Sequence, residues 1–392
     1  MEFKFNKEER VIKRAVSNFA QNELAAQKID TMCYLPMDVV QKMGELGFLG
    51  MMIPEEYGGV QANWMGLGIV AEEIAKKSIA MAYLIMLTCV EGLLLATYGT
   101  EEAKQKWIPD LCKGKIVGCI SVTEPECGAD FAAIKTTAIR GGDFYLLRGE
   151  KSPVSFGSQA DFVILFAKTN LEAGAMGITA FLIPLDFPGI TKLTIKNMGL
   201  LPAPSAHLML DDVRIPAEYK IGNEGEGFDI NKSLGLSSDF FQIFSGLIPM
   251  GLAQSALNLA ITHAKNRTAF GRPISQFQAI SGRIAENATL IEMGRWLCYK
   301  ALWRKDQGSS PTREAAMCSW WCPKSAYQII EDALLIHGHA GYSDDYPFQQ
   351  MLRDVIAFEI IGGAEEAMKL LIAREVIGRG AIPEGLTDNA TY

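Results

Sequence analysis

The sequence predicts an α+β multidomain protein with an N-terminal α-helical domain, a middle antiparallel β domain and a C-terminal four-helix bundle. Three observations predict this order. Apolar residues recur at helical spacing over residues 1–114, short strand-like runs fill residues 115–225, and helical spacing returns over residues 226–392. The 392 residues are 49% hydrophobic and 21% charged, so the chain is long enough for several domains and too apolar for extended disorder.

The N-terminal domain is predicted from apolar residues three or four positions apart, such as Ile12, Val16 and Phe19. Its longest apolar stretch, residues 79–96, approaches the length of a membrane span, but it contains Glu91 and ends in a polar turn. We therefore expect a buried core helix there and no membrane span.

The middle domain is predicted from short runs of Val, Ile, Phe and Tyr that are separated by turn residues. These runs are residues 116–122, 144–147, 162–167, 178–183 and 207–210. Gly141-Gly142-Asp143 is typical of a hairpin turn. Because no helical pattern lies between the runs, we expect an antiparallel sandwich or barrel rather than a parallel sheet.

The C-terminal domain is predicted from four long segments with helical spacing, at residues 228–266, 274–306, 311–340 and 347–378. Ser310 followed by Pro311 fits an N-cap with proline at the first helical position of the third segment. Four long helices in succession favour a bundle.

Charge and composition exclude several classes of function. Lys and Arg number 37 against 45 Asp and Glu, a net charge of −8, so we expect neither a nucleic-acid nor an anionic-membrane partner. Residues 1–6 lack the basic and apolar runs of a secretory signal, which predicts a cytoplasmic protein. The eight scattered cysteines are then expected to be free thiols.

Two further motifs are interpreted as structural. The glycine-rich residues 222–227 do not follow a strand in a βαβ unit, so we expect no dinucleotide-binding turn there. Cys318 and Cys322 lie one helical turn apart, and His337 and His339 follow, which is compatible with zinc. Tryptophan and alanine neighbours favour core packing instead, and we expect no metal.

Glu91 is the most pointed chemical signal, because its helix is apolar on most sides. Burial would raise the pKa of its carboxyl group and make it a candidate proton acceptor. A buried partner such as an arginine would instead give Glu91 a structural role. The residues alone leave both possibilities open.

Several short motifs, in this order and spacing, resemble the acyl-CoA dehydrogenase family. They are Val122-Thr123-Glu124-Pro125, Gly128-Ala129-Asp130, Arg267-Thr268-Ala269-Phe270-Gly271 and Phe277-Gln278. Further matches at residues 53–59, 98–100, 337–342 and 351–354 extend the likeness over nearly the whole chain. The resemblance implies FAD held between the β domain and the C-terminal bundle, an acyl-CoA substrate, a homotetramer, and electron transfer to an electron-transfer flavoprotein.

The resemblance also implies roles for individual residues. Four residues are expected to face the isoalloxazine ring of FAD: Val122, Thr123, Val154 and Ser155. Arg267, Phe270 and Gln278 are expected to meet the pyrophosphate and adenosine of FAD from a neighbouring subunit, which suits the paired donors of an arginine. The substrate is expected to lie against Ala129, Asp239, Gly362 and Gly363.

The sequence departs from the family at the residues that matter most for catalysis. Pro153 stands where a tryptophan usually lies beside the flavin. Gly362 occupies the position of the usual catalytic glutamate, and Phe241 occupies the position that carries the base in isovaleryl-type members. The helix of Glu91 borders the acyl end of the substrate site in this family, so Glu91 becomes the candidate base. Glu365 and Glu366 lie near Gly362 in sequence, but they face other sides of the helix.

A base displaced toward the distal acyl end resembles the cyclohex-1-ene-1-carboxyl-CoA dehydrogenases of the family. The implied reaction removes a proton from C3, which is acidic through vinylogy, and a hydride from C6, giving cyclohexa-1,5-diene-1-carboxyl-CoA. We expect aspartate at the base position of that subgroup, and glutamate reaches one methylene farther. The alternatives are a cyclohexane-1-carboxyl-CoA dehydrogenase, a crotonobetainyl-CoA reductase-like enzyme, and a catalytically silent flavoprotein or CoA-binding subunit.

Overall fold

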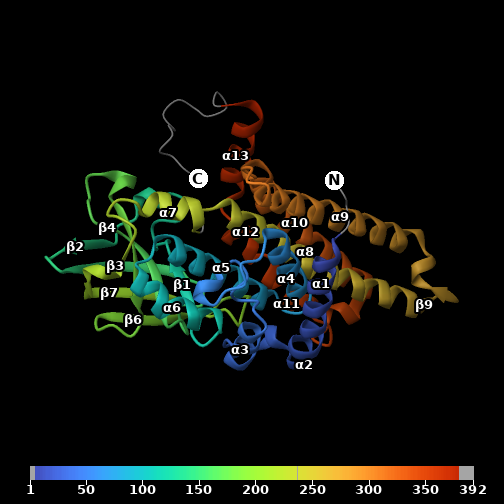
Figure 1. Cartoon of the computed structure of the whole chain (residues 1–392). Coiled ribbons are helices and arrows are strands. Elements are labelled where there is room, and N and C mark those ends of the chain that lie inside the picture. The colour runs from blue at the N-terminus through green and yellow to red at the C-terminus, as the bar shows by residue number, and fades with distance from the viewer. Residues whose placement is uncertain (1–4, 236, 379–392) are drawn as a thin grey trace.

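The computed structural model describes residues 5–235 and 237–378, and its element order confirms the predicted fold of helical, β and helical domains. Figure 1 shows the β domain at one side of the molecule and the helical domains packed beside it. The N-terminal domain contains α1 (Lys7–Phe19), a π-helical turn (Ala20–Leu24), α2 (Ala25–Gln27), α3 (Met37–Glu45), α4 (Trp64–Ala75), α5 (Ile79–Tyr98) and α6 (Glu101–Cys112).

Helix α5 is the centre of the structure. The hydroxyl of Ser78 caps its first turn by accepting a hydrogen bond from the amide of Met81. Nearly every residue from Ile79 to Leu95 is buried, because α4, α6, α8 (Asp239–Asn266) and the first β-strand pack around it. The helix is long and apolar enough to cross a membrane, but its burial inside the protein is that of a core helix, as the sequence predicts.

The described strands of the middle domain form one eight-stranded sheet. They are β1 (Gly118–Ser121), β2 (Thr137–Arg140), β3 (Phe144–Val154), β4 (Phe162–Lys168), β5 (Ile178–Pro184), β6 (Ile190–Ile195), β7 (Ser205–Pro216) and β8 (Lys220–Ile221). Most neighbours pair antiparallel, and β2 and β3 form the expected hairpin with Gly142 at φ +81°. Only β1 and the start of β2 depart from the expectation, because each pairs parallel with β4.

Both faces of β4 are buried, which explains its unbroken apolar sequence. Phe162, Ile164 and Phe166 face the helical domains, whereas Val163 and Leu165 belong to a separate apolar core inside the curved β domain. Successive side chains of a strand point to opposite faces, so only a strand covered on both sides reads as a continuous apolar run. The sheet therefore joins the helices through one face and carries its own core on the other.

The C-terminal domain contains α7 (Gly227–Leu234), α8, a short hairpin of β9 (Thr268–Ala269) and β10 (Arg272–Pro273), α9 (Gln278–Asp306), α10 (Thr312–His337), α11 (Phe348–Val355), α12 (Ala357–Ile361) and α13 (Glu365–Ile377). Helices α8, α9 and α10 are the long members of the bundle, and α13 packs on α10. Pro311 is the N-cap of α10, one position later than the predicted N-cap at Ser310. Residues 379–392 of the predicted domain lie outside the described residues.

Two of the four predicted long helices are interrupted. The predicted helix over residues 347–378 is wrong, because the chain breaks at Gly362-Gly363, where Gly363 has φ +106°. The predicted helix over residues 228–266 is also wrong as a single element. Gly235 is extended there, and Ser238 begins α8 by accepting a hydrogen bond from the amide of Phe241. Both breaks lie beside residues of the candidate site.

Cys318, Cys322 and His337 of the cysteine and histidine motif pack in the core, as the sequence favours, whereas His339 is exposed. Cys318 and Cys322 are buried, with the sulfur of Cys322 3.9 Å from that of Cys298 on α9. All eight cysteines are free thiols. His337 stacks on His263 rather than on the cysteines, and the described residues contain no group of side chains that could hold a metal ion.

A buried pair of carboxyl groups joins the three domains near the start of α5. Asp30 accepts hydrogen bonds from the hydroxyl of Ser78 and from the amide of Ile79 (3.1 Å). Asp354 of α11 accepts a hydrogen bond from the amide of Leu200 in the middle domain (2.7 Å). Burial, followed by the charge of Asp354, raises the pKa of Asp30 to about 7.

We predict that Asp30 makes stability fall as the pH rises. Because the pKa of Asp30 is raised above that of the unfolded chain, the folded protein holds a proton that the unfolded chain releases. Its contribution is complete below about pH 4 and is lost as the pH rises through about 7. Urea unfolding should therefore show wild-type stability falling by roughly 2 kcal/mol between about pH 5.5 and 8.

The Asp30→Asn variant should abolish most of this dependence, because the neutral amide mimics a protonated carboxyl group. Asp38→Asn, on the exposed start of α3, is the control and should keep the wild-type pH profile. An Asp30→Asn protein whose stability still falls with the wild-type slope would assign the dependence to another group.

Candidate active site

A buried ion pair fixes the segment that the sequence predicts to face the flavin. The ammonium group of Lys151 on β3 lies 2.9 Å from Oε1 of Glu124 and donates to the carbonyl of Val122 at 3.1 Å. Glu124 also accepts from the amides of Lys135 and Thr136. Burial alone would raise the pKa of Glu124, but Lys151 and these hydrogen bonds lower it below its usual value, so the pair is ionised.

The ion pair places the end of β1 against the end of β3. The amide of Ser152 donates to the carbonyl of Thr123 at 3.0 Å, so Val122 and Thr123 lie beside the segment that leads to Val154 and Ser155. Val122 and Val154 are buried, whereas Thr123 and Ser155 are partly exposed. The structure therefore brings together all four residues expected at the isoalloxazine ring.

The three domains meet at Tyr83 of α5, and we call this place the Tyr83 junction. The hydroxyl of Tyr83 donates to Oγ of Ser155 at 3.0 Å. Its ring lies 5.6 Å from that of Phe156, just after β3, and 5.7 Å from that of Phe358 on α12. Tyr83 cannot be singled out from the sequence, because a tyrosine within an apolar helix has no signal that distinguishes it from other core residues.

Glu91 is fully buried, and neither of its carboxyl oxygens has a hydrogen-bond partner among the described residues. Desolvation raises the pKa of Glu91 well above its usual value. The carboxyl group lies against Gly118 of β1, where an added Cβ would be 2.5 Å from Oε2 of Glu91 and equally close to the ring of Phe162. Among the described residues, no arginine pairs with Glu91, so the structural role that such a partner would give it is not supported.

Glu91 and the Tyr83 junction lie at different points along α5. Their eight-residue separation corresponds to about 12 Å along the helix axis. The structure therefore does not bring Glu91 into direct contact with Ser155. Its carboxyl group lies deeper, at the start of β1, whereas the four residues expected at the flavin lie at the ends of β1 and β3.

The position of the usual catalytic glutamate is filled by the neighbouring helices. A Cβ added to Gly362 would lie 2.5 Å from Oγ of Ser319 on α10 and 2.9 Å from Cβ of Ser245 on α8. The hydroxyl of Ser319 also donates to the carbonyl of Gly362 at 2.8 Å. Gly362 itself has a helical φ of −71°, so space rather than backbone conformation forbids a side chain there. Phe241, the other vacated base position, is buried in α8.

The other residues expected at the substrate are spread around this region. Asp239, in the first turn of α8, accepts a hydrogen bond from the hydroxyl of Thr312 at 3.0 Å, and burial raises the pKa of Asp239. Gly363 carries the positive φ at the break between α12 and α13. Ala129 is exposed in the loop between β1 and β2, and no described contact joins it to these residues.

The second predicted group of FAD-binding residues lies far from the first within one chain. Arg267, Phe270 and Gln278 are exposed on the β9–β10 hairpin and at the start of α9. Figure 1 shows this hairpin at the opposite end of the molecule from the β domain. Phe270 is 97% exposed in the single chain, and such exposure is unusual for a phenylalanine. One chain therefore presents the two groups on opposite sides.

The residues at the ends of β1 and β3 fit the polar edge and the faces of a flavin ring. The hydroxyls of Thr123 and Ser155 supply donors, and Val122 and Val154 supply apolar surface beside them. On the hairpin, Arg267 offers paired donors to phosphate, and Phe270 offers an exposed ring. These residues suit FAD, provided that a second chain contributes its hairpin.

Comparisons with known proteins identify the family of the chain. The profiles of the acyl-CoA dehydrogenase N-terminal, middle and C-terminal domains match residues 6–115, 119–213 and 242–377. The chain is 35% identical over 383 residues to a probable acyl-CoA dehydrogenase, YngJ, of Bacillus subtilis (strain 168), covering 96% of this chain and 100% of that protein.

Two further similar proteins have names that mention a cofactor or a partner protein. The chain is 32% identical over 381 residues to the caffeyl-CoA reductase-Etf complex subunit CarC of Acetobacterium woodii, covering 94% of this chain and 98% of CarC. It superimposes on the FAD complex of PigA with a TM-score of 0.89 and 28% identity, covering 97% and 100% of the two chains. The chain therefore belongs to the acyl-CoA dehydrogenase family, FAD-binding oxidoreductases that act on CH–CH bonds of acyl-CoA thioesters.

Proposed function

We propose that the protein dehydrogenates cyclohex-1-ene-1-carboxyl-CoA to cyclohexa-1,5-diene-1-carboxyl-CoA, with Glu91 as the proton acceptor. One observation carries the proposal: Glu91 is a fully buried carboxyl group that has no hydrogen-bond partner among residues 5–235 and 237–378. It lies on the helix that also contributes Tyr83 to the junction with Ser155. A buried polar group without a hydrogen-bond partner costs free energy, so its presence in the core favours a chemical role.

The location of Glu91 supports proton removal away from the thioester α-carbon. The carboxyl group is displaced along α5 from Ser155, and the usual base position at Gly362 is occupied by Ser245 and Ser319. FAD, when bound, supplies the acceptor for a hydride. Glu91 would take the C3 proton of the ring, while the C6–H bond supplies the hydride, and the remaining electron pairs form the two conjugated double bonds.

The raised pKa of Glu91 fits an acceptor of a weakly acidic proton. Burial makes the neutral acid more stable than it is in water, so the ionised form is a stronger base once it is formed. The pKa shift also makes the neutral form a proton donor in the reverse direction. The same site therefore suits reduction of the diene, and the direction depends on the electron acceptor.

The alternative functions differ in the carbon atom from which a proton is removed. A cyclohexane-1-carboxyl-CoA dehydrogenase or a crotonobetainyl-CoA reductase-like enzyme would move a proton at the α-carbon, and a silent flavoprotein would move none. Anaerobic mixing with cyclic and linear acyl-CoA thioesters, while flavin bleaching is followed, separates these functions. We expect bleaching by cyclohex-1-ene-1-carboxyl-CoA, and bleaching only by linear saturated thioesters would reject the cyclic assignment.

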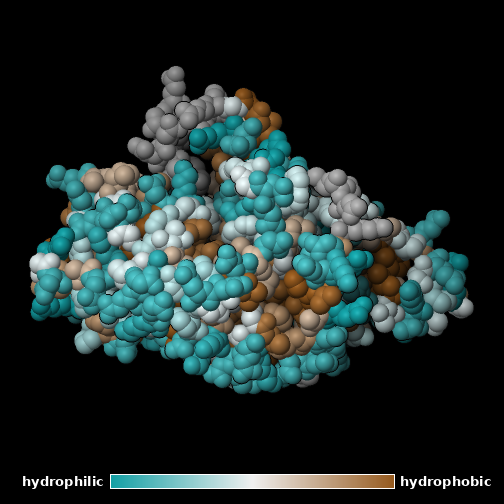
Figure 2. All heavy atoms as spheres, in the orientation of Figure 1, coloured by the Kyte–Doolittle hydropathy of each residue, from teal (hydrophilic) through white to brown (hydrophobic). Residues whose placement is uncertain are grey.

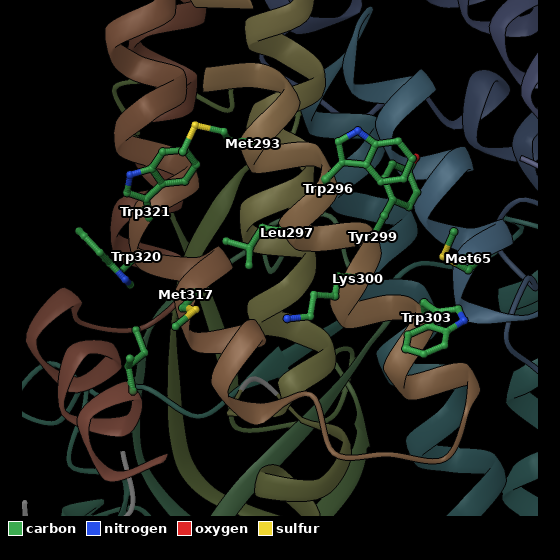
Figure 3. A pocket seen from close by; sticks show the side chains of 11 residues that line it. Met65, Met293, Trp296, Leu297, Tyr299, Lys300, Trp303, Met317, Trp320 and Trp321 are labelled. Atoms are coloured by element: carbon green, nitrogen blue, oxygen red, sulfur yellow. The ribbon is translucent and has the colours of Figure 1, made fainter. Parts of the chain in front are cut away.

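We also propose that the active form is a homotetramer and that an electron-transfer flavoprotein accepts its electrons. An open apolar groove of about 830 Å³ lies on α9 and α10, with Trp296, Trp303, Trp320 and Trp321 on its walls (Figure 3). The face shown in Figure 2 is mostly hydrophilic, with hydrophobic side chains near its middle. An apolar surface of this kind favours a second copy of the chain, which would also bring Phe270 to a neighbouring FAD.

The relative CarC, as a subunit of a reductase-Etf complex, supports the electron-transfer partner.

The first prediction tests the base. Glu91→Gln keeps the size of the side chain but removes the proton acceptor, so flavin reduction by cyclohex-1-ene-1-carboxyl-CoA should slow by at least about 100-fold. FAD content should stay at the wild-type level. Stopped-flow absorbance of the flavin measures the rate.

Glu102→Gln, on the exposed first turn of α6, is the matched control and should reduce at the wild-type rate. A second variant, Gly118→Ala, should also slow reduction, because its methyl group would displace the carboxyl group of Glu91. Wild-type rates in Glu91→Gln would transfer the role of base to another group.

The second prediction concerns the vacated base position. Gly362→Glu should lower the free energy of unfolding by roughly 1 to 3 kcal/mol, because its Cβ would clash with Ser319 and Ser245. Combining it with Ser319→Ala should recover part of the loss. Urea unfolding measures both effects, and Gly282→Glu, where an added Cβ meets no atom within 4 Å, is the control.

The clash with Ser319 and Ser245 also means that a glutamate at residue 362 should not simply restore the usual chemistry. A Gly362→Glu protein as stable as Gly282→Glu, with new 1,2-dehydrogenation of cyclohexane-1-carboxyl-CoA, would show that the missing carboxylate alone blocks that reaction.

The third prediction tests the assembly. Met293, which lines the groove, is 55% exposed, and Met293→Lys would place a charge in an apolar contact. Analytical ultracentrifugation should show a wild-type tetramer and smaller species for the variant. Met176→Lys, at a residue 61% exposed on the β domain, should remain tetrameric. A monomeric wild-type protein, or an unchanged Met293→Lys tetramer, would reject the groove as the interface.

A further inference from the structure

Tyr83 is almost completely buried, yet it carries a hydroxyl group into an apolar environment. Only 3% of the residue is exposed, and its ring packs against Phe156 and Phe358. These ring contacts would be served equally well by a phenylalanine. Desolvating the hydroxyl costs free energy unless it is hydrogen-bonded, and it donates to Oγ of Ser155 at 3.0 Å. The hydrogen bond to Ser155 is therefore what the hydroxyl of Tyr83 adds to the packing of its ring.

The hydrogen bond restricts what Ser155 can do. A serine hydroxyl has one hydrogen to donate and two lone pairs that accept. Because Ser155 accepts from Tyr83, its own hydrogen points to a different partner. Ser155 is only partly buried and follows Val154 at the end of β3, among the residues that suit the polar edge of the flavin. Tyr83 thus leaves Ser155 oriented as a donor.

We propose that Tyr83 is a positioning residue for FAD, which acts through Ser155 by holding the serine hydroxyl as a hydrogen-bond donor to the flavin ring. This inference rests on the placement of FAD at Ser155, but it does not depend on the identity of the acyl-CoA substrate. It gives the N-terminal domain a part in cofactor binding, although none of the four residues expected at the ring comes from that domain.

The protonation state of Tyr83 is consistent with this role. Burial raises the pKa of Tyr83 to about 12, so the phenol keeps its proton across the physiological range. The charge of Glu91 is a lesser cause of the same shift. A tyrosine that remains protonated is a permanent donor and not a base. Its contribution is therefore to orientation, and proton transfer remains with Glu91.

Helix α5 contains an internal control for the proposal. Tyr98, near its other end, lies 3.1 Å from the hydroxyl of Ser233 on α7. The two tyrosine–serine contacts have the same chemistry, but the Tyr98 contact is exposed and lies at the far end of α5 from the Tyr83 junction. A general loss of helix packing would follow from either substitution, whereas a loss of flavin orientation follows only from Tyr83.

The experiment is a double-mutant cycle on the full-length protein. Tyr83→Phe, Ser155→Ala and the double variant are each depleted of FAD and titrated with FAD alone, before any acyl-CoA is added. The dissociation constant and the visible absorption spectrum of the bound flavin are measured. Each single variant should bind FAD about two- to tenfold more weakly, the usual effect of one neutral hydrogen bond, with a shifted flavin band.

The double variant should bind FAD no more weakly than Ser155→Ala, because Tyr83 acts only through the serine. Tyr98→Phe should match the wild-type dissociation constant and spectrum. Ser155→Thr, which keeps the hydroxyl, should restore most of the affinity that Ser155→Ala loses. Tyr83→Phe keeps the ring contacts with Phe156 and Phe358, so this variant should fold and the role of the hydroxyl can be tested.

Three results would overturn the proposal: an unchanged flavin band and affinity in Tyr83→Phe, additive losses in the double variant, or equal losses in Tyr98→Phe. A failure of the proposed function appears differently. If wild-type flavin is not bleached by cyclohex-1-ene-1-carboxyl-CoA while the cycle behaves as expected, the substrate is wrong and the role of Tyr83 stands.

Discussion

Helix α5 imposes the constraint on which the rest of the structure depends, because it is apolar on every side. Sixteen of its twenty residues are buried, and each large apolar side chain contributes about 1.5 to 3 kcal/mol when it leaves water. Such a helix must be covered all round, so the helical domains and β1 close around it. Gly92 allows Ile53 to approach the helix closely, since a Cβ there would lie 2.2 Å from the side chain of Ile53. Burial of this one helix brings Tyr83 and Glu91 into the interior.

The two buried carboxylates near β1 have opposite environments, and the contrast separates structure from chemistry. Glu124 is satisfied by Lys151 and by two backbone amides, so its charge stabilises the turn that carries Val122 and Thr123. Glu91 has no such partner in the part of the chain that the structure describes, so the cost of desolvating its carboxyl group is not compensated there. A paired carboxylate such as Glu124 stabilises the structure of the site. An unpaired carboxyl group such as Glu91 is available to exchange a proton.

Much of the fold could be predicted from the sequence, because periodicity records how each element is buried. The two-sided apolar run at β4 and the apolar helix at α5 are examples. The breaks at Gly235 and Gly363 could not be predicted, since an apolar period continues across a backbone turn. Parallel pairing of β1 with β4 depends on long-range register, which no local pattern records.

The candidate site was predictable only in part, for a related reason. Motifs placed Val122, Thr123, Val154 and Ser155 together, and the structure agrees. Glu91 could be singled out because a charge inside an apolar run is conspicuous, whereas its lack of a partner appears only in three dimensions. Contacts between domains or helices determine the roles of Tyr83, Ser245 and Ser319, and the local sequence around these residues does not predict those contacts.

The central claim is that proton removal occurs at a ring carbon distant from the thioester. The most direct measurement uses cyclohex-1-ene-1-carboxyl-CoA labelled with deuterium at C3, with the label followed by mass spectrometry of the thioester and by deuterium NMR of the water. We expect one C3 deuterium to pass to the solvent during turnover and the product to be the 1,5-diene. Turnover to a product that retains all of the C3 deuterium would contradict this expectation.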